Sequence, residues 1–281
     1  MEIFLAPYAG FCSGVDRAFK IALGIAAKEK PVYLLGDIVH NSVVVTRLEE
    51  QGIQRIKNIS ELKNLPRGTV IIRTHGAPPE VFTAVKKLGF KLVDATCPIV
   101  RKVQQLAQQL KNQGYQVVIV GEKNHPEIQG VLGWVDGAAI VIEEAADVFK
   151  IKKGERVGVV VQTTQSLDKF KAIEEAILKC TQDVKIENTI CNAIAKSQKS
   201  AVELAGKVDL MLVIGDPKSA NTKRLAELCE EKVTTHRIET AAELKNQWFA
   251  NKSKVGVTAG TSTPQWIIDD VICTLKNLKS K

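Results

Sequence analysis

The chain has 281 residues, of which 45% are hydrophobic and 25% charged. This composition is typical of a globular protein and excludes a disordered or fibrous chain, and the length predicts two or three domains. The formal net charge of +8 favours anionic partners, whereas an aromatic content of only 5% disfavours a nucleic-acid binder that stacks bases.

Short apolar runs alternate with amphipathic stretches along the chain, which predicts parallel sheets covered by helices. After a strand at 3–5, the first part predicts helices at 15–28, 43–51, 60–64 and 80–88, and strands at 31–36, at 69–73 and ending at Cys97. The second part predicts helices at 99–112, 145–149 and 167–179, and strands at 116–121, 139–142, 156–161 and ending at Cys191. The third part predicts helices at 193–206, 221–231 and 264–278, and strands at 210–215 and 255–258.

These three parts repeat one pattern. Cys12, Cys97 and Cys191 each stand where a strand meets a helix, and the residues 28 positions later are His40, His125 and Ser219 (40 − 12, 125 − 97 and 219 − 191). A polar loop recurs in each part, at Thr74-His75-Gly76, Gln162-Thr163-Thr164-Gln165 and Gly260-Thr261-Ser262-Thr263. Such self-similarity indicates three equivalent supersecondary units.

The fold class predicted is therefore α/β, with three pseudo-equivalent domains of parallel sheet at 12–96, 97–190 and 191–281. The third part lacks a closing strand, so we expect the N-terminal segment 1–11 to complete it. Ligands bind at the carboxyl ends of parallel strands, where every cysteine and polar loop of the repeat falls. If the three domains turn these ends to a common centre, they form a composite site.

The N-terminus lacks the basic and apolar regions of a signal peptide, and no stretch has the length of a membrane helix. We therefore expect a cytoplasmic protein without membrane contact. In that reducing compartment the six cysteines are expected to be free, catalytic or metal-bound rather than paired.

The repeated cysteines are candidate metal ligands, because a helix N-terminus favours the thiolate. A cysteine taken alone is more often a small buried residue, which is our expectation for Cys180, Cys229 and Cys273. The sequence has no Cys-x-x-Cys pair, which disfavours a structural zinc finger and favours an iron–sulfur cluster. Three ligands would leave one iron of a cubane cluster open to substrate.

The polar loops are candidate parts of a diphosphate pocket, since imidazoles, hydroxyls and helix N-termini bind phosphate oxygens. The expected binding residues are His40, His75, His125, Thr164, Ser219, Asn221 and Ser262. Glu127 would carry protons there, with Thr163 and Thr164 positioning it or relaying protons. A solvated loop carboxylate is the alternative for Glu127, and His236 is expected to be structural. Nucleotide-binding motifs are absent from the sequence.

Eight motifs in order resemble those of the 4-hydroxy-3-methylbut-2-enyl diphosphate reductases, the last enzymes of the methylerythritol phosphate route to isoprenoids, over essentially the whole chain. They are Gly10-Phe11-Cys12-Ser13-Gly14-Val15, Val39-His40-Asn41, Thr74-His75-Gly76, Asp94-Ala95-Thr96-Cys97-Pro98, His125-Pro126-Glu127, Gln162-Thr163-Thr164, Thr189-Ile190-Cys191 and Thr258-Ala259-Gly260-Thr261-Ser262.

The resemblance implies a trefoil of three α/β domains around a [4Fe-4S] cluster held by Cys12, Cys97 and Cys191. It further implies that two electrons and two protons remove the substrate hydroxyl as water, giving isopentenyl or dimethylallyl diphosphate. Glu127 matches the proton donor of the family and Thr163 the threonine that acts with it. A small acidic ferredoxin or flavodoxin would suit the positive charge as electron donor.

Two positions depart from the family pattern: Ala220 stands where many members have a second serine, and Gln104 where a histidine is expected. The competing hypothesis is a non-enzymatic phospholigand or redox sensor that uses the same cluster and anion pocket. A basic nucleic-acid binder is disfavoured because the lysines are spread over many helices.

Overall fold

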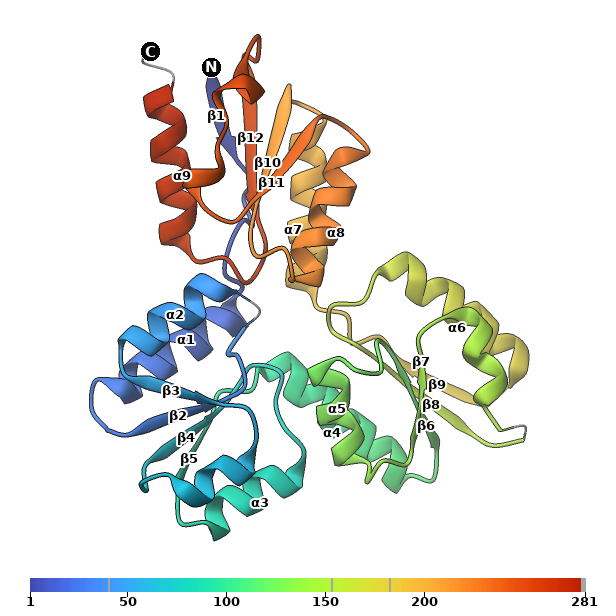
Figure 1. Cartoon of the computed structure of the whole chain (residues 1–281). Coiled ribbons are helices and arrows are strands. Elements are labelled where there is room, and N and C mark those ends of the chain that lie inside the picture. The colour runs from blue at the N-terminus through green and yellow to red at the C-terminus, as the bar shows by residue number, and fades with distance from the viewer. Residues whose placement is uncertain (40, 153, 182, 279–281) are drawn as a thin grey trace. The chain divides into compact units, whose positions relative to one another are not determined.

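Three parallel four-stranded sheets carry the fold in the computed structural model of the chain (Figure 1). The structure describes residues 1–39, 41–152, 154–181 and 183–278. The chain divides into two compact units, one of Met1–Asp16, Val39–Glu50 and Asn192–Lys281 and the other of Arg17–Ile38 and Gln51–Cys191. We call these the terminal unit and the central unit. No described helix is long and apolar enough to cross a membrane.

The first sheet of the central unit has the strand order β3-β2-β4-β5. Its strands are β2 (Val32–Leu35), β3 (Ile53–Ile56), β4 (Thr69–Ile72) and β5 (Lys91–Asp94). Along the chain these strands alternate with α1 (Ser13–Ala26), α2 (Ser42–Glu50), the 3-10 helix η1 (Ile59–Asn64) and α3 (Pro79–Lys87). Tyr33 and Phe90 meet edge to face in its core, with ring centroids 5.8 Å apart.

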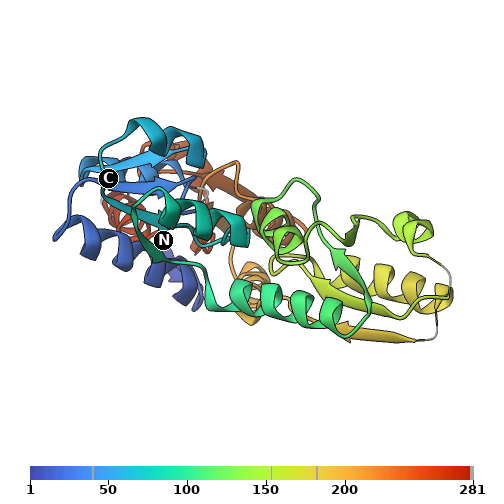
Figure 2. The ribbon, with the colours of Figure 1, turned by 90° about the horizontal axis from the view of Figure 1, so that it is seen from below.

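The second sheet, also in the central unit, has the order β7-β6-β8-β9. Its strands are β6 (Gln116–Val120), β7 (Ala139–Ile142), β8 (Val157–Val161) and β9 (Val184–Glu187). The helical elements are α4 (Pro98–Asn112), α5 (Pro126–Trp134), η2 (Ala145–Lys150) and α6 (Leu167–Cys180). Separate apolar clusters join the sheet to α4 and α5 and to η2 and α6, so both of its faces are buried; Figure 2 gives a second view of these layers.

The third sheet belongs to the terminal unit and joins the two ends of the chain. Its order is β1-β12-β10-β11, with β1 (Glu2–Leu5), β10 (Leu210–Ile214), β11 (Thr235–Ile238) and β12 (Lys254–Ala259). The blue β1 lies beside the red β12 in Figure 1, with Ile3 opposite Val255. The helical elements are α7 (Asn192–Ala205), α8 (Ala220–Glu230), η3 (Ala241–Glu243), η4 (Asn246–Phe249) and α9 (Gln265–Leu278).

The α/β fold with three parallel sheets confirms the fold class expected from the sequence. In strand order, β1 stands beside β12 as β5 stands beside β4 and β9 beside β8. Among the described residues, five elements were not predicted: β3, β11, α5 and the short 3-10 helices η3 and η4. The strands β3 and β11 are short edge strands with exposed or half-buried polar residues, which weakens the apolar signal. The helix α5 has nine residues including two glycines, which lower its helical propensity.

Candidate active site

The three repeated cysteines stand in equivalent places, each just after the last strand of its repeat or, for Cys12, after β1. The backbone N–H of each donates to a carbonyl of the polar loop that follows the neighbouring strand. Cys97 donates to Thr74 at 2.9 Å, Cys191 to Thr163 at 2.8 Å and Cys12 to Thr261 at 3.3 Å. The fold therefore joins the backbone of a repeated cysteine to a polar loop at the carboxyl end of every sheet.

Cys97 and Cys191 both belong to the central unit, and both are half-buried. Burial raises the pKa of the Cys97 thiol, and the negative charges of Cys191 and Glu127 raise it further, while the N–H groups of Ile99 and Val100 act in the opposite direction. Because the two thiols and the carboxylate affect one another, they lie close together. Without a positive partner this environment favours the neutral thiol of Cys97, and a metal ion would favour its thiolate.

Glu127 lies in the first turn of α5 and is only 1% exposed. Its carboxylate accepts two hydrogen bonds from Thr163, one from the backbone N–H to Oε1 and one from the hydroxyl to Oε2, both 2.7 Å long. Burial raises the pKa of Glu127 from 4.5 to about 7, although both bonds from Thr163 lower it. The group can thus gain and lose a proton near neutral pH.

His125 caps the helix that carries Glu127. Its Nδ1 accepts a hydrogen bond from the backbone N–H of Glu127 at 3.2 Å, so a neutral ring carries its proton on Nε2. His75, from the loop after β4, meets His125 with ring centroids 5.4 Å apart and an interplanar angle of 80°. The central unit therefore brings two of the predicted histidines together at the start of the helix that carries Glu127.

The loop that contains Thr163 and Thr164 is held by its own side chains. The Gln162 amide nitrogen donates to the Thr164 hydroxyl at 2.9 Å, and its oxygen accepts from the backbone N–H of Glu122 at 2.8 Å. Thr164 is half-buried. These bonds fix the backbone on which Thr163 reaches Glu127.

The terminal unit holds the other predicted binding residues that the structure describes. Ser219 caps α8 by accepting from the backbone N–H of Thr222 at 3.3 Å, and the Asn221 amide donates to the Thr261 hydroxyl at 3.3 Å. The side-chain oxygens of Asn221, Thr222 and Ser262 are buried without a hydrogen-bond partner among the described residues. Buried polar groups usually have partners, so these oxygens suit a bound ligand or water. His40 lies outside the described residues.

Two glycines shape the same loops of the terminal unit. A Cβ at Gly260 would lie 2.2 Å from the Thr222 hydroxyl, and one at Gly215 would lie 2.6 Å from it. Only glycine allows the two loops to approach Thr222 so closely. The loops after β10 and β12 are thereby packed against each other at the carboxyl end of the third sheet.

Arg101 and Gln104 form a hydrogen-bonded pair to which the sequence analysis assigned no role. Gln104 on α4 is fully buried and accepts a hydrogen bond from Arg101 at 2.8 Å, while Arg101 also pairs with Asp94. The guanidinium of Arg101 lies over the rings of Phe82 and Trp134 at 5.2 and 5.1 Å. The spacing of Arg101 and Gln104 by three residues, one turn after Cys97, was the available signal.

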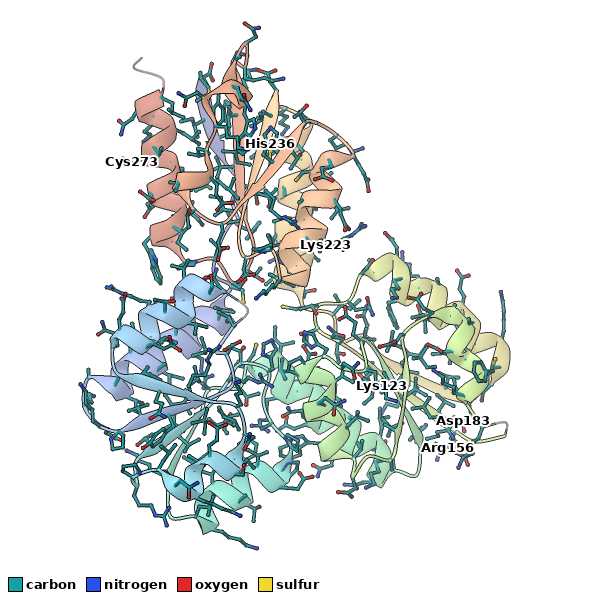
Figure 3. All side chains as sticks on the ribbon, in the orientation of Figure 1. Lys123, Arg156, Asp183, Lys223, His236 and Cys273 are labelled. Carbon is teal, nitrogen blue, oxygen red and sulfur yellow. The ribbon has the colours of Figure 1, made fainter. Side chains whose placement is uncertain are left out.

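The remaining cysteines and His236 lie elsewhere. Cys229 is buried as expected, but Cys180 and Cys273 are exposed, so the expectation that they serve packing is wrong. Cys180 is the last residue of α6, and Cys273 lies on α9 (Figure 3 labels Cys273). His236 stacks on Trp248 with centroids 4.0 Å apart, which is a packing contact.

These features define an enzyme of the α/β class, with thiols, a protonatable buried carboxylate and hydroxyl-rich loops at the carboxyl ends of parallel strands. The chain belongs to the LytB protein family, whose model matches residues 3–276. It is 45% identical to the 4-hydroxy-3-methylbut-2-enyl diphosphate reductase of Geobacter metallireducens, in an alignment that covers 100% of this chain and 99% of the relative. A relative of the same name from Geobacter sp. strain M21 is 44% identical over 97% of this chain and 96% of its own.

Solved structures agree with this assignment. One, described as (E)-4-hydroxy-3-methyl-but-2-enyl diphosphate reductase, the terminal enzyme of the non-mevalonate pathway, is 43% identical with a TM-score of 0.79. The alignment covers 99% of this chain and 100% of the chain of the solved structure. The E-1-hydroxy-2-methyl-but-2-enyl-4-diphosphate reductase from Plasmodium falciparum is 29% identical, with a TM-score of 0.89 over 98% of this chain and 88% of its own.

Proposed function

We propose that this chain is an iron–sulfur oxidoreductase that converts (E)-4-hydroxy-3-methylbut-2-enyl diphosphate to isopentenyl and dimethylallyl diphosphates. Full-length relatives that bear the reductase name support the substrate. The observation that carries the proposal is the backbone hydrogen bond from each repeated cysteine to a polar loop, because it joins each proposed cluster ligand to a loop with proposed binding residues. The three repeats at 12–96, 97–190 and 191–281, the last with 1–11, would be the three domains.

A [4Fe-4S] cluster would be held by Cys12, Cys97 and Cys191. The donor set fits such a cluster, because Cys97 and Cys191 are half-buried neighbours and the sulfur of Cys97 accepts backbone N–H groups at the start of α4. When bound, the cluster supplies single electrons and one iron without a thiolate ligand, at which the substrate hydroxyl can bind. Two electrons and two protons reduce the C–O bond and release the hydroxyl as water.

The residues of the chain bind the diphosphate and deliver the proton. His40, His75, His125, Thr164, Ser219, Asn221 and Ser262 would donate hydrogen bonds to the phosphate oxygens. Glu127 holds a proton because its pKa is about 7, and it donates that proton to the departing hydroxyl. Thr163 orients the carboxyl group through its two hydrogen bonds.

The electrons would come from a small acidic protein, a ferredoxin or a flavodoxin. The net charge of +8 favours the encounter with such a partner and makes its rate depend on ionic strength. A small dye reductant would not show the same dependence.

The test is the iron content and turnover of anaerobically purified variants, assayed with a reduced dye. Cys97→Ser should lose iron and activity, whereas Cys273→Ser, which alters an exposed cysteine outside the proposed site, should keep both. Glu127→Gln should keep iron and diphosphate binding but lose turnover by about 10²- to 10⁴-fold. Iron and activity in Cys97→Ser would contradict the proposal, and diphosphate binding without electron consumption in the wild type would favour a sensor.

A further inference from the structure

A cavity of about 250 Å³ lies inside the central unit, separate from the residues proposed to bind the diphosphate. Its wall comes from the ends of β2 and β4, the start of η1, the first residues of α3 and the first turns of α5. Leu35, Ile59, Ala77 and Val81 supply apolar surface, and Arg73 and Lys57 supply positive charge. None of the described residues assigned above to the diphosphate lines it.

The cavity lies at the topological switch point of the first sheet. In the order β3-β2-β4-β5 the neighbours β2 and β4 lead to strands on opposite sides, β2 to β3 and β4 to β5. Leu35 ends β2, and Arg73 directly follows β4, so the cavity opens between the carboxyl ends of these two strands. This crevice is the usual ligand site of open parallel α/β sheets.

Arg73 is a half-buried cation that the rest of the site does not use. Its guanidinium lies against the backbone of Gly36, where a Cβ would come within 2.4 Å of Nη1. Burial lowers the pKa of Arg73, and the charge of Asp37 acts in the opposite direction. The Asp37 carboxylate is bound instead by Arg55 at 2.7 Å. Among described residues, no hydrogen bond or ion pair engages the Arg73 guanidinium, and a desolvated charge without a partner is unfavourable.

We infer that this Arg73 cavity binds a small organic anion that has a single carboxylate or phosphate head group and a short apolar body. The planar guanidinium fork matches the two oxygens of either head group. The apolar body would lie against Leu35, Ala77 and Val81. A ligand of this kind neutralises Arg73 and buries the apolar wall at the same time.

An occupant of the cavity would also touch the backbone beside two residues of the proposed site. Gly76 and Ala77 line the cavity directly after His75, and Pro126 lines it directly before Glu127. We therefore expect binding to change turnover, an effect that rests on the proposed function. Binding itself does not depend on that function, so the two can fail separately.

The probe is phenyl phosphate, titrated calorimetrically into the full-length protein, with benzoate as the carboxylate probe and phenol as the neutral analogue. We expect saturable binding of at least one anion and none of phenol. Arg73→Met should weaken binding at least tenfold. Arg67→Met, which makes the same charge change at an exposed residue before β4, should leave the affinity within twofold.

Two further variants decide the location of the probe. Val81→Phe fills the cavity without a charge change and should also weaken binding, which guards against loss of fold in Arg73→Met. Asn221→Ala alters the proposed diphosphate site and should keep the affinity for phenyl phosphate. The inference is overturned if neither anion binds, if Arg73→Met binds as the wild type does, or if Asn221→Ala abolishes binding.

Discussion

At the residue scale, Glu127 is a buried carboxyl group whose environment favours its neutral form. Its burial removes the carboxylate from water, and Thr163 returns only part of that solvation through two hydrogen bonds. The result is a pKa of about 7, so the folded protein binds a proton at pH values where an exposed glutamate has lost it. Stability and activity should therefore both depend on pH through this group.

The wild type should lose stability as pH rises through 7, because the folded state binds the proton of Glu127 more tightly than the unfolded state does. The pKa of Glu127 is 4.5 in the unfolded state and about 7 in the folded state. Its stabilising contribution is therefore fully present below pH 4.5 and is lost as the pH rises through 7. Compared with Glu127→Gln, the free energy of unfolding should fall by about 2–3 kcal/mol between pH 5 and pH 8. Urea denaturation of both proteins measures this, and parallel pH profiles would refute it.

The hydroxyl of Thr163 should set the pH range of turnover. Thr163→Val removes a hydrogen bond that lowers the pKa of Glu127, so that pKa should rise and Glu127 should stay protonated to higher pH. The upper limb of the pH profile of kcat, near 7 in the wild type, should then move to higher pH. Thr163→Ser keeps the hydroxyl and should restore the wild-type profile, whereas an unmoved limb in Thr163→Val would exclude this coupling.

At the element scale, the turn after β4 carries His75 and depends on Gly76. Gly76 has φ of +71°, and a Cβ there would lie 2.4 Å from the amide nitrogen of Gln104. The turn is therefore packed against α4 as well as strained for any other residue. Gln104, which the sequence marked only as a departure from the family pattern, therefore packs against this turn.

Gly76→Ala and Gly137→Ala separate backbone strain from packing. Both glycines have φ of +71°, but a Cβ at Gly137 would meet no atom within 4 Å. Gly137→Ala should therefore cost about 1 kcal/mol of unfolding free energy, and Gly76→Ala a further ~1–3 kcal/mol because Gln104 must move. Equal losses in urea denaturation would show that the contact with Gln104 is unimportant.

At the scale of the whole molecule, the first strand of the chain, β1, stabilises the third sheet, which also contains the last strand, β12. The backbone N–H of Ala6 donates to Val257 at 2.9 Å, and Ile3 packs against the apolar cluster of the third sheet. The terminal unit is thus built from both ends of the sequence, whereas both sheets of the central unit come from the middle.

Deletion of residues 1–5 should loosen the third sheet without affecting the second. Hydrogen exchange should speed up in β12 and β10, because β12 becomes an edge strand that pairs only with β10, and should stay unchanged in β6 and β8. Mass spectrometry of peptic peptides resolves these strands. Unchanged exchange in β12 would mean that β1 contributes little to this sheet.

The sequence by itself determined the α/β class, most of the strands and helices, and the place of each repeated cysteine, because these features follow from local periodicity and from spacing along the chain. The sequence predicted that Glu127 and Thr163, 36 residues apart, act together, but not that they are in contact. Their two hydrogen bonds depend on how α5 meets the loop after β8. Only the tertiary structure decided that contact, the edge strands β3 and β11, and the Arg73 cavity. Each of them arises where segments distant in sequence are brought together by the register of a sheet, which no local pattern encodes.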